Sequence, residues 1–487
     1  MTKVKSRLTD VCSMARSCHP RQSIAVIVAV FGVSGFAAIT RAQEKPAPPS
    51  HPGVHHFAPA DARFLDEVQK GCFNYFWNEV GTPAMLAKDR KLGPVASIAA
   101  VGFQLSSLPI GVERGWITRE QGADRAATVL RALLGRDDNK KWGMYMHFPD
   151  MNTAGPSSHG YECEASTVDT ALLIAGAIPA GEYFGGDVAK LVDRLVSEAD
   201  WKRYAVAENG FITMAWKPTN KKTLDGPGDF MKHHWWVASD EERIVYFLAV
   251  GTPNADHAVP PALYYKLKRQ LASDAPGALG PFAMSWNGSL FTYLFSHCWI
   301  DYASLGKDDP ARLGSDAPPI NWFESSRAAV LAHRARCIAL TECESSLGDN
   351  AWGLSACDGQ EGYIVPSLRP SFENADRTFG CTIAPYAAGT ALMLTPVESL
   401  AALRAFRDLN DSAGKSLVWN SPDSGGYGFA DAFKLGGESP WISKDNIGID
   451  AGPMLLGIEN ARTGLIWRLF MKSETARRAV QRLRLSN

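Results

Sequence analysis

The chain has 487 residues, of which 46% are hydrophobic and 21% are charged, which is the composition of an ordinary soluble globular protein. Its 50 lysines and arginines nearly balance its 51 aspartates and glutamates, so the net charge is only -1. This balance gives no sign of a protein that binds nucleic acid or an anionic membrane surface. The length allows one large domain or two to three average ones.

The first 42 residues are predicted to be a signal peptide. An apolar run over residues 24–39 is followed by a plausible cleavage sequence that ends at Ala42. The run is short for a membrane span, which favours cleavage over a retained anchor. Residues 43–60 are then a proline-rich spacer. We therefore expect a periplasmic or secreted protein that has no membrane contact after cleavage. The basic residues ahead of the apolar run are Lys3, Lys5, Arg7, Arg16 and Arg21.

Helical periodicity begins near residue 60 and continues almost without a break to residue 485. Residues 64–77 place apolar side chains at three- and four-residue steps. Residues 95–112 are small and apolar on all sides, which is typical of a helix buried all round. Thr118 opens a capping box, and an amphipathic helix is predicted over residues 119–134.

The same alternation of apolar and amphipathic segments recurs further along the chain. Residues 165–178 are apolar throughout and precede an amphipathic segment at 187–201. Residues 243–251 are apolar and precede an amphipathic segment at 261–272. Further amphipathic helices are predicted at 325–338, 396–409 and 473–485.

Buried helices that alternate with half-exposed ones indicate two concentric layers. Strand signals are few, and no period of about 20 to 50 residues repeats by identity, which argues against a solenoid. We therefore predict an all-α fold, an (α/α)6 barrel of alternating inner and outer helices, formed by residues 61–487 as a single domain. The inner helices of such a barrel run parallel, so their N-termini meet at one end.

The cysteines suggest neither a disulfide scaffold nor a metal centre. Seven remain after residue 42, and an odd number leaves at least one of them unpaired or available to another chain. The sequence contains neither Cys-x-x-Cys nor His-Glu-x-x-His, so we predict no metal and no cofactor. The seven are Cys72, Cys163, Cys298, Cys337, Cys343, Cys357 and Cys381.

Three predicted apolar helices carry acids at their starts: Asp169, Glu241 and Asp450. Two of these starts also fit a capping box, and acids in a first turn are stabilised by the helix dipole. Capping accounts for Asp169 and for Glu242, but it does not require Glu241. It also does not explain why Asp450 stands between glycines ahead of Pro453, which we place in a first helical turn.

Paired carboxylates across a sugar-sized opening are the equipment for glycoside hydrolysis, one as acid and the other as base or nucleophile. Aromatic residues crowd the predicted loops, where rings can stack on the apolar faces of sugars. For a tryptophan in such a loop, sugar binding and core packing are about equally good interpretations. The aromatic residues in question are Trp142, Trp216, Trp235, Trp236, Trp286, Trp299, Trp322, Trp352, Trp441 and Tyr427.

The chain resembles the glucoamylase-like glycoside hydrolases that include bacterial endo-β-1,2-glucanases (glycoside hydrolase family 144). The blocks that carry the resemblance lie between about residues 64 and 472, and they include ASTVDTALLIAGAI, DEERIVYFLAVGTP, SHCWIDY, YGFADAF and GIDAGP. The resemblance implies an (α/α)6 barrel that hydrolyses β-1,2-glucan or its oligosaccharides by endo cleavage with inversion. We expect a monomer whose partner is this glucan.

The resemblance also implies roles for individual residues. Glu241 matches the general acid, Asp450 the general base, and Asp169 a further essential acid in the cleft. The predicted substrate-binding residues are Glu164, His147, His297, Trp299, Asp301, Trp352, Asp358, Tyr427, Phe429 and Glu459.

Two positions depart from the family pattern. Ser239-Asp240 stands where the family more often has Tyr-Asn, and Ala303 where it has an arginine. Both lie near the predicted cleft. Two alternatives therefore stay open: an exo-acting or transglycosylating enzyme of the same fold, and a glycan-binding protein without catalytic activity.

The two proposed catalytic carboxyl groups have opposite needs. Glu241 must hold a proton, and we expect Asp240, Glu242 and burial under bound sugar to raise its pKa against the helix dipole. For Asp450 we expect room for water and backbone N–H donors that favour the carboxylate.

Overall fold

The computed structural model of the chain describes residues 51–159, 163–206, 208–273, 275–343, 347–436 and 440–485. The predicted signal peptide and the first part of the predicted spacer lie outside these described residues. Within them, no helix combines the length and the apolar character needed to cross a membrane.

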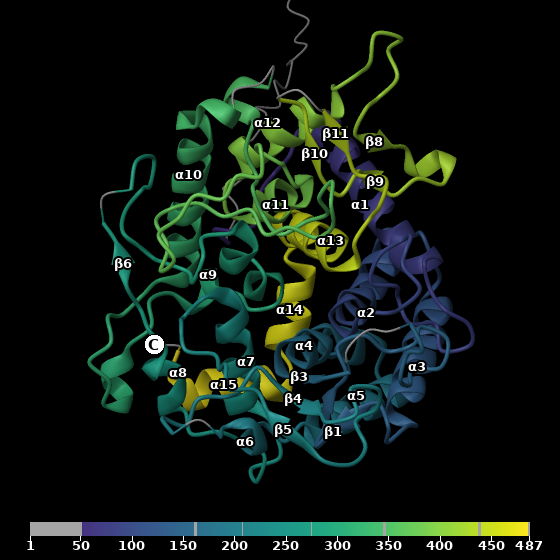
Figure 1. The fold of residues 1–487 in the computed structure, drawn as a ribbon, viewed down its shortest axis with the longest axis vertical. Coiled ribbons are helices and arrows are strands. Elements are labelled where there is room, and N and C mark those ends of the chain that lie inside the picture. Colours follow the sequence, from purple (N-terminus) through teal and green to yellow (C-terminus); the bar gives the residue numbers. More distant parts are fainter. Residues whose placement is uncertain are drawn as a thin grey trace, which may run out of the picture. The chain divides into compact units, whose positions relative to one another are not determined.

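Helices dominate the described part of the chain (Figure 1). The α-helices are α1 (Pro59–Asn78), α2 (Ile98–Glu113), α3 (Arg119–Leu134), α4 (Thr167–Phe184), α5 (Gly186–Glu198), α6 (Trp201–Tyr204), α7 (Asp240–Gly251), α8 (Ala262–Lys266), α9 (Tyr302–Leu305), α10 (Trp322–Ala339), α11 (Pro385–Thr390), α12 (Pro396–Arg407), α13 (Gly448–Thr463), α14 (Leu465–Met471) and α15 (Glu474–Leu483). Short 3₁₀ helices are η1 (Leu290–Tyr293), η2 (Ser296–Cys298), η3 (Pro310–Leu313), η4 (Thr341–Cys343), η5 (Gly348–Asn350), η6 (Ala391–Met393) and η7 (Pro422–Ser424).

Strands are confined to short antiparallel pairings in the connections, in the order β1-β2, β3-β4-β5, β6-β7, β8-β9 and β10-β11. They are β1 (Lys140–Lys141), β2 (Met144–Tyr145), β3 (Ala165–Ser166), β4 (Ala215–Pro218), β5 (Gly228–Phe230), β6 (Leu271–Ala272), β7 (Phe282–Ala283), β8 (Trp419–Asn420), β9 (Gly428–Phe429), β10 (Phe433–Lys434) and β11 (Trp441–Ile442). Strand β3 runs directly into α4, and the pairing of Ser166 with Ala215 fixes where that helix begins.

The helices form the two predicted layers. The inner layer consists of α2, α4, α7, the η1–η2 segment, α11 and α13, in which α2 packs on both α4 and α13, α4 packs on α7, and α11 packs on α13. Figure 1 shows α1, α3, α5, α10, α12 and α15 outside them. This is an (α/α)6 barrel, as predicted, except that two 3₁₀ turns occupy one inner position in place of an α-helix.

Small residues let the two longest apolar inner helices approach closely. A Cβ atom added at Gly102 of α2 would lie 2.2 Å from the Leu172 carbonyl oxygen, and one at Gly176 of α4 would lie 1.9 Å from the Gly102 carbonyl oxygen. The Ser106 hydroxyl then donates a hydrogen bond of 3.1 Å to the Gly176 carbonyl across this contact. The apolar pattern of both segments therefore reflects burial on every side.

The helix starts follow the predicted signals only in part. Thr118 forms its capping box at α3, and the Ser166 side chain caps α4. The box expected at Ser239 does not form, because the Ser239 hydroxyl accepts the Trp286 N–H instead, at 3.3 Å. The prediction for Pro453 is wrong: α13 begins five residues earlier, at Gly448, so Pro453 lies inside the helix.

The prediction of a helix over residues 261–272 is also wrong beyond the first turn. Only α8 forms there, and the chain then turns into an extended segment that ends in β6. Its backbone pairs with the segment ahead of α7, where the Lys268 N–H donates to the Trp236 carbonyl at 2.7 Å. The buried Arg269–Asp308 ion pair, at 2.9 Å, holds this extended segment against the η3 region.

The cysteines match the expectation from their odd number. Cys343 and Cys381 form a disulfide, and the other five described cysteines are buried as free thiols.

Part of the predicted spacer contacts the barrel. The His55 N–H donates to the Ala461 carbonyl at 2.7 Å, and the His51 ring meets Asp301 at 2.9 Å.

Candidate active site

The N-terminal ends of the inner helices surround a cavity of about 650 Å³. Ser97 caps α2, Asp169 lies in the first turn of α4, Glu241 in that of α7 and Ile449 in that of α13. The meeting of helix starts at one end is the arrangement expected of a barrel whose inner helices run parallel. The full lining is Asp89, Arg90, Ser97, His147, Phe148, Val168, Asp169, Glu241, Phe291, Phe295, Ala356, Gly362, Tyr363, Tyr386, Ile447 and Ile449.

Asp169 is held in place from two sides. Its Oδ2 accepts a hydrogen bond of 2.5 Å from the Ser166 hydroxyl, and its Oδ1 lies 3.5 Å from Nε2 of His147. Only 5% of the residue is exposed. The short β3–α4 junction thus fixes the orientation of this carboxylate at the cavity wall.

His147 links Asp169 to a second acid. Its Nδ1 lies 3.4 Å from Oε1 of Glu164, whose other oxygen is 3.0 Å from Nζ of Lys217. Burial alone would lower the pKa of His147, but Asp169 and Glu164 together raise it above its ordinary value. The hydrogen bond from His147, assisted by Lys217, lowers the pKa of Glu164. The predicted binding residues His147 and Glu164 therefore form one charged unit with Asp169.

Glu241 has a different environment from Asp169: among the described residues, the charges that shift its pKa are those of two acids, Glu242 and Asp169. Burial, followed by Glu242 and Asp169, raises the pKa of Glu241 well above its ordinary value. Burial also raises the pKa of Glu242 to about 8. Of the causes that we expected for the raised pKa of Glu241, burial and Glu242 contribute, but Asp240 does not. The Asp240 carboxylate instead pairs with buried Arg243 and accepts the Ser296 N–H at 3.0 Å.

Asp450 lies on a separate hollow of about 20 Å³ that adjoins the cavity, with Tyr386 and Ile447 lining both. The residue is only 2% exposed, and neither carboxyl oxygen accepts a hydrogen bond from the described part of the chain. Burial and then neighbouring Asp431 raise the pKa of Asp450 well above its ordinary value. The expectation that backbone donors would favour the carboxylate is therefore wrong.

Asp431 was not singled out from the sequence, although it lies within the YGFADAF block. Its Oδ2 accepts the Asp358 N–H at 2.7 Å, and its Oδ1 accepts the Ile447 N–H at 3.2 Å. Burial raises the pKa of Asp431 to about 7. This side chain ties the start of α13, and with it Asp450, to the loop that carries Asp358.

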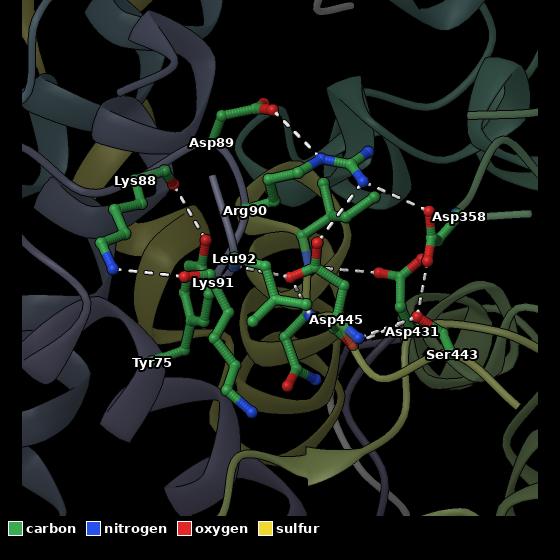
Figure 2. A network of polar contacts seen from close by, with 12 residues as sticks. Tyr75, Lys88, Asp89, Arg90, Lys91, Leu92, Asp358, Asp431, Ser443 and Asp445 are labelled. Atoms are coloured by element: carbon green, nitrogen blue, oxygen red, sulfur yellow. Dashed lines mark hydrogen bonds and ion pairs between the residues drawn. The ribbon is translucent and has the colours of Figure 1, made fainter. Parts of the chain in front are cut away.

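Arg90 is the second residue that the sequence did not reveal. Figure 2 shows it between Asp89, Asp358 and Asp445. Its Nη1 lies 3.2 Å from Asp358 and 3.4 Å from Asp445, and its Nε lies 3.7 Å from Asp89. The predicted binding residue Asp358 also accepts the Ser443 hydroxyl at 2.8 Å. Arg90 thus joins loops that are far apart in the chain at the cavity wall.

Two other predicted binding residues, Tyr427 and Phe429, line the small hollow with Asp450. The Tyr427 hydroxyl donates to Glu79 at 2.8 Å, and its ring meets that of Tyr75 edge-on. These two aromatic residues therefore lie where they were predicted, beside the acids.

Five of the predicted binding residues lie elsewhere, and we correct those predictions: His297, Trp299, Asp301, Trp352 and Glu459. None of them lines the cavity or the hollow. Glu164 and Asp358 do not line either one, but they form ion pairs with the lining residues His147 and Arg90. Trp299 and Trp352 are fully buried, and the Trp299 ring N–H donates to Ser106 at 3.0 Å. Asp301 pairs with His51. These side chains lie in the interior or bind residues away from the cavity.

His297 and Glu459 are core polar residues of the same kind. His297 is fully buried, with Nε2 2.9 Å from the Ser326 hydroxyl, and burial and Arg243 lower its pKa well below the ordinary value. Glu459 is 1% exposed and forms an ion pair of 2.7 Å with Arg114. The His297 ring thus links η2 to α10, and the Glu459 carboxylate links α13 to the end of α2. Among the described residues, no group of three or more His, Cys, Asp or Glu side chains is arranged to hold a metal ion.

Comparison with known proteins agrees with this architecture. The family model described as "Glycoamylase: Putative glucoamylase" matches residues 233–474. An exo β-1,2-glucooligosaccharide sophorohydrolase (non-reducing end) from Parabacteroides distasonis is 26% identical over 453 residues, which cover 87% of this chain. The match spans only 58% of the length of that relative.

Two crystal structures share the fold. A putative glucoamylase from Bacteroides uniformis ATCC 8492 has 27% identity and a TM-score of 0.71, covering 89% of this chain and 100% of that one. An endo-β-1,2-glucanase from Chitinophaga pinensis, in complex with sophorotriose and glucose, has 24% identity and a TM-score of 0.70, covering 88% and 98%. The chain thus has the helical-barrel fold of these glucoamylase-like proteins, as the resemblance implied.

The charged unit around His147 generates a prediction about titration. Because its pKa is raised on folding, the His147 interaction contributes stability fully below pH about 6.5, the ordinary histidine value, and loses it as the pH rises through the folded pKa. We expect NMR of ring-labelled histidine to give a His147 pKa above 6.5. Glu164→Gln should lower that pKa, whereas Glu324→Gln on exposed α10 should leave it unchanged. An unshifted pKa in the Glu164 variant would show that the two groups are not coupled.

Proposed function

We propose that the chain is a glycoside hydrolase that cleaves β-1,2-glucan or its oligosaccharides. The observation that carries the proposal is the placement of Asp169 and Glu241 on one cavity, with Asp450 on the hollow beside it. A pair of carboxyl groups, one of which holds a proton, is the basic equipment for hydrolysing a glycosidic bond. The linkage in the proposal comes from the named activities of the sophorohydrolase and the endoglucanase that resemble this chain.

Glu241 is the proposed general acid. Such an acid must be protonated near the working pH in order to deliver a proton to the leaving oxygen. The enclosed wall of the cavity, Glu242 and Asp169 all raise the pKa of Glu241. The positive end of the α7 dipole opposes them, but it is worth only about 0.3–1 kcal/mol. Burial and the two neighbouring acids therefore decide the protonation state in favour of the acid form.

Asp450 is the proposed general base. The hollow beside it, of about 20 Å³, is large enough for one water molecule, which needs about 10–15 Å³. The two unpartnered carboxyl oxygens of Asp450 are free to accept hydrogen bonds from such a water. Attack by this water on the face opposite the leaving oxygen would invert the anomeric centre.

A second assignment of the base has its own observation. Asp169, unlike Asp450, lies on the large cavity and is oriented by Ser166 and His147. In this alternative Asp169 activates the water and Asp450 shapes the neighbouring hollow. Substitution of each acid separates the two assignments, as described below.

We further propose endo cleavage, on the basis of the resemblance to endo-β-1,2-glucanases. An exo-acting enzyme is the alternative, and the sophorohydrolase among the relatives favours it. Export to the periplasm or beyond and a monomeric state complete the proposal. The export part depends on the basic and apolar run within the first 42 residues.

Product analysis tests the reaction itself. Purified protein incubated with long β-1,2-glucan should release reducing ends, and a mixture of short oligosaccharides should appear early, with α-anomers visible first by NMR. Other β-glucans and α-glucans serve as controls and should be cleaved poorly. A single disaccharide product would overturn endo cleavage, and binding without any release of reducing ends at any pH would show a glycan-binding protein.

Substitution of the acids tests the assigned roles. Glu241→Gln and Asp450→Asn should each lower kcat about 10²- to 10⁴-fold, because each removes one acid–base partner. Both variants should stay folded, since the amides keep nearly the same shape. Glu242→Gln is the matched control, because this buried neighbour does not line the cavity. Its substitution should lower kcat far less.

The pH dependence of activity is a second test of the proposed base. Asp450 must be ionised to act as base, and its pKa is raised, so activity should fall on acidification well above pH 4, the ordinary aspartate range. The Asp450 variant should lose this acidic limb. Full activity maintained down to pH 4, or an active Asp450→Asn beside an inactive Asp169→Asn, would move the base to Asp169.

A further inference from the structure

One wall of the cavity is a short hairpin, residues 357–364, that carries no predicted role beyond Asp358. Cys357 and Ile364 exchange two backbone hydrogen bonds, of 3.0 and 2.9 Å, and so close the loop between them. Gly362 has a φ of +123°, a conformation that side chains rarely adopt. This turn directs the next residue, Tyr363, to the cavity wall.

Tyr363 is more exposed than three other aromatic residues of the wall. It is 51% exposed, whereas Phe291, Phe295 and Tyr386 are each less than a tenth exposed. Those three rings therefore pack into the core, while a large part of the Tyr363 ring has no protein cover. An uncovered aromatic ring in a cavity that also contains carboxyl groups suits a sugar ring. The ring can stack on the apolar C–H surface of the sugar, and the carboxyl groups can bind its hydroxyl groups.

The phenol of Tyr363 is affected by the charges of the nearby acids. Burial, followed by the charge of Asp450, raises the pKa of the phenol well above its ordinary value. Asp431 and Asp89 act on it in the same direction. Tyr363 thus lines the cavity that carries Glu241 and is close enough to Asp450 to be affected by its charge.

The hairpin is held at its base by a clasp of charged and polar groups (Figure 2). Asp358 directly follows Cys357. Its carboxylate forms an ion pair with Arg90 at 3.2 Å and accepts a hydrogen bond from the Ser443 hydroxyl at 2.8 Å. Its backbone N–H donates to Asp431 at 2.7 Å. The base of the hairpin is therefore fixed from three directions, and the position of Tyr363 follows from it.

We propose that Tyr363 is a substrate-contacting residue whose ring stacks on a glucosyl unit bound between Glu241 and Asp450, and that Arg90 positions it by clasping the hairpin. This inference rests on the proposed function and adds a specific sugar contact to the same site.

Binding measurements test the stacking contact apart from the chemistry. Isothermal titration with a defined β-1,2-linked glucooligosaccharide, on the full chain carrying Glu241→Gln, gives Kd without turnover. Tyr363→Ala should weaken binding about threefold to tenfold, the range measured for aromatic contacts, and Tyr363→Phe should stay within about twofold. Phe379→Ala is the matched control, because Phe379 is 47% exposed but does not line the cavity, and it should leave Kd unchanged.

A double-mutant cycle tests the positioning role of Arg90. Arg90→Lys keeps the charge but loses the forked geometry that contacts several carboxylates at once. It should weaken binding severalfold in the parent but add little in the Tyr363→Ala background, because the two residues act through one contact. A loss of general packing would instead be additive and would appear as lowered thermal stability.

Each outcome has a distinct meaning. Unchanged Kd in Tyr363→Ala overturns the contact, and an equal loss in Tyr363→Phe overturns stacking in favour of a hydroxyl contact. Additive effects of Arg90→Lys overturn the positioning role. Binding that Tyr363→Ala weakens as predicted, together with no turnover by the unsubstituted protein, would refute the hydrolase proposal alone. Absence of any oligosaccharide binding would refute both.

Discussion

Helices α2 and α4 pack backbone against backbone at Gly102 and Gly176, where even a methyl group would overlap a carbonyl oxygen. Close packing of this kind fixes the two helices along their axes as well as sideways, because interiors of proteins have little free volume. The first turn of α4 is thereby held level with the start of α2. Asp169 and the cap residue Ser97 reach the same cavity as a result.

At this end of the barrel, helix dipoles and burial have opposite effects on the ionisation of the acids. The dipoles favour ionised acids at every inner-helix start, by about 0.3–1 kcal/mol each. Removal of a carboxylate from water costs more than this unless donors replace the water. Asp169 has such donors, while Glu241 and Asp450 do not, and the pKa values of these last two are raised accordingly. Burial thus outweighs the dipole at the starts of α7 and α13, which favours a proton on Glu241 for acid catalysis.

The sequence was informative wherever periodicity or capping dominated. Helix α3 spans residues 119–134, as predicted, and the three helix starts with acids do meet at one end. The sequence was misleading where a residue was assigned to the site by its side-chain type, without regard to how far along the helix it lies. Glu459 lies nine residues beyond Asp450 in α13, which is about 13 Å further along the axis, so it faces Arg114 deep in the core.

The remaining parts of the site depend on contacts that no local pattern encodes. Arg90, Asp431 and Tyr363 lie in loops without periodicity. Arg90 and Asp431 both reach Asp358 only because segments about 70 to 270 residues apart fold together (Figure 2). Asp431 lies within a recognisable block, as does the predicted Asp358, so a search for acids in every block would have found it too. Arg90 had no comparable signal.

The most direct test of the account is a crystal structure of the Glu241→Gln variant with a β-1,2-linked glucose oligosaccharide. The account predicts sugar in the cavity of about 650 Å³, with a glycosidic oxygen within hydrogen-bonding distance of the residue 241 side chain and a water beside Asp450. Sugar bound only elsewhere on the surface, or a glycosidic oxygen that no carboxyl group approaches, would contradict it.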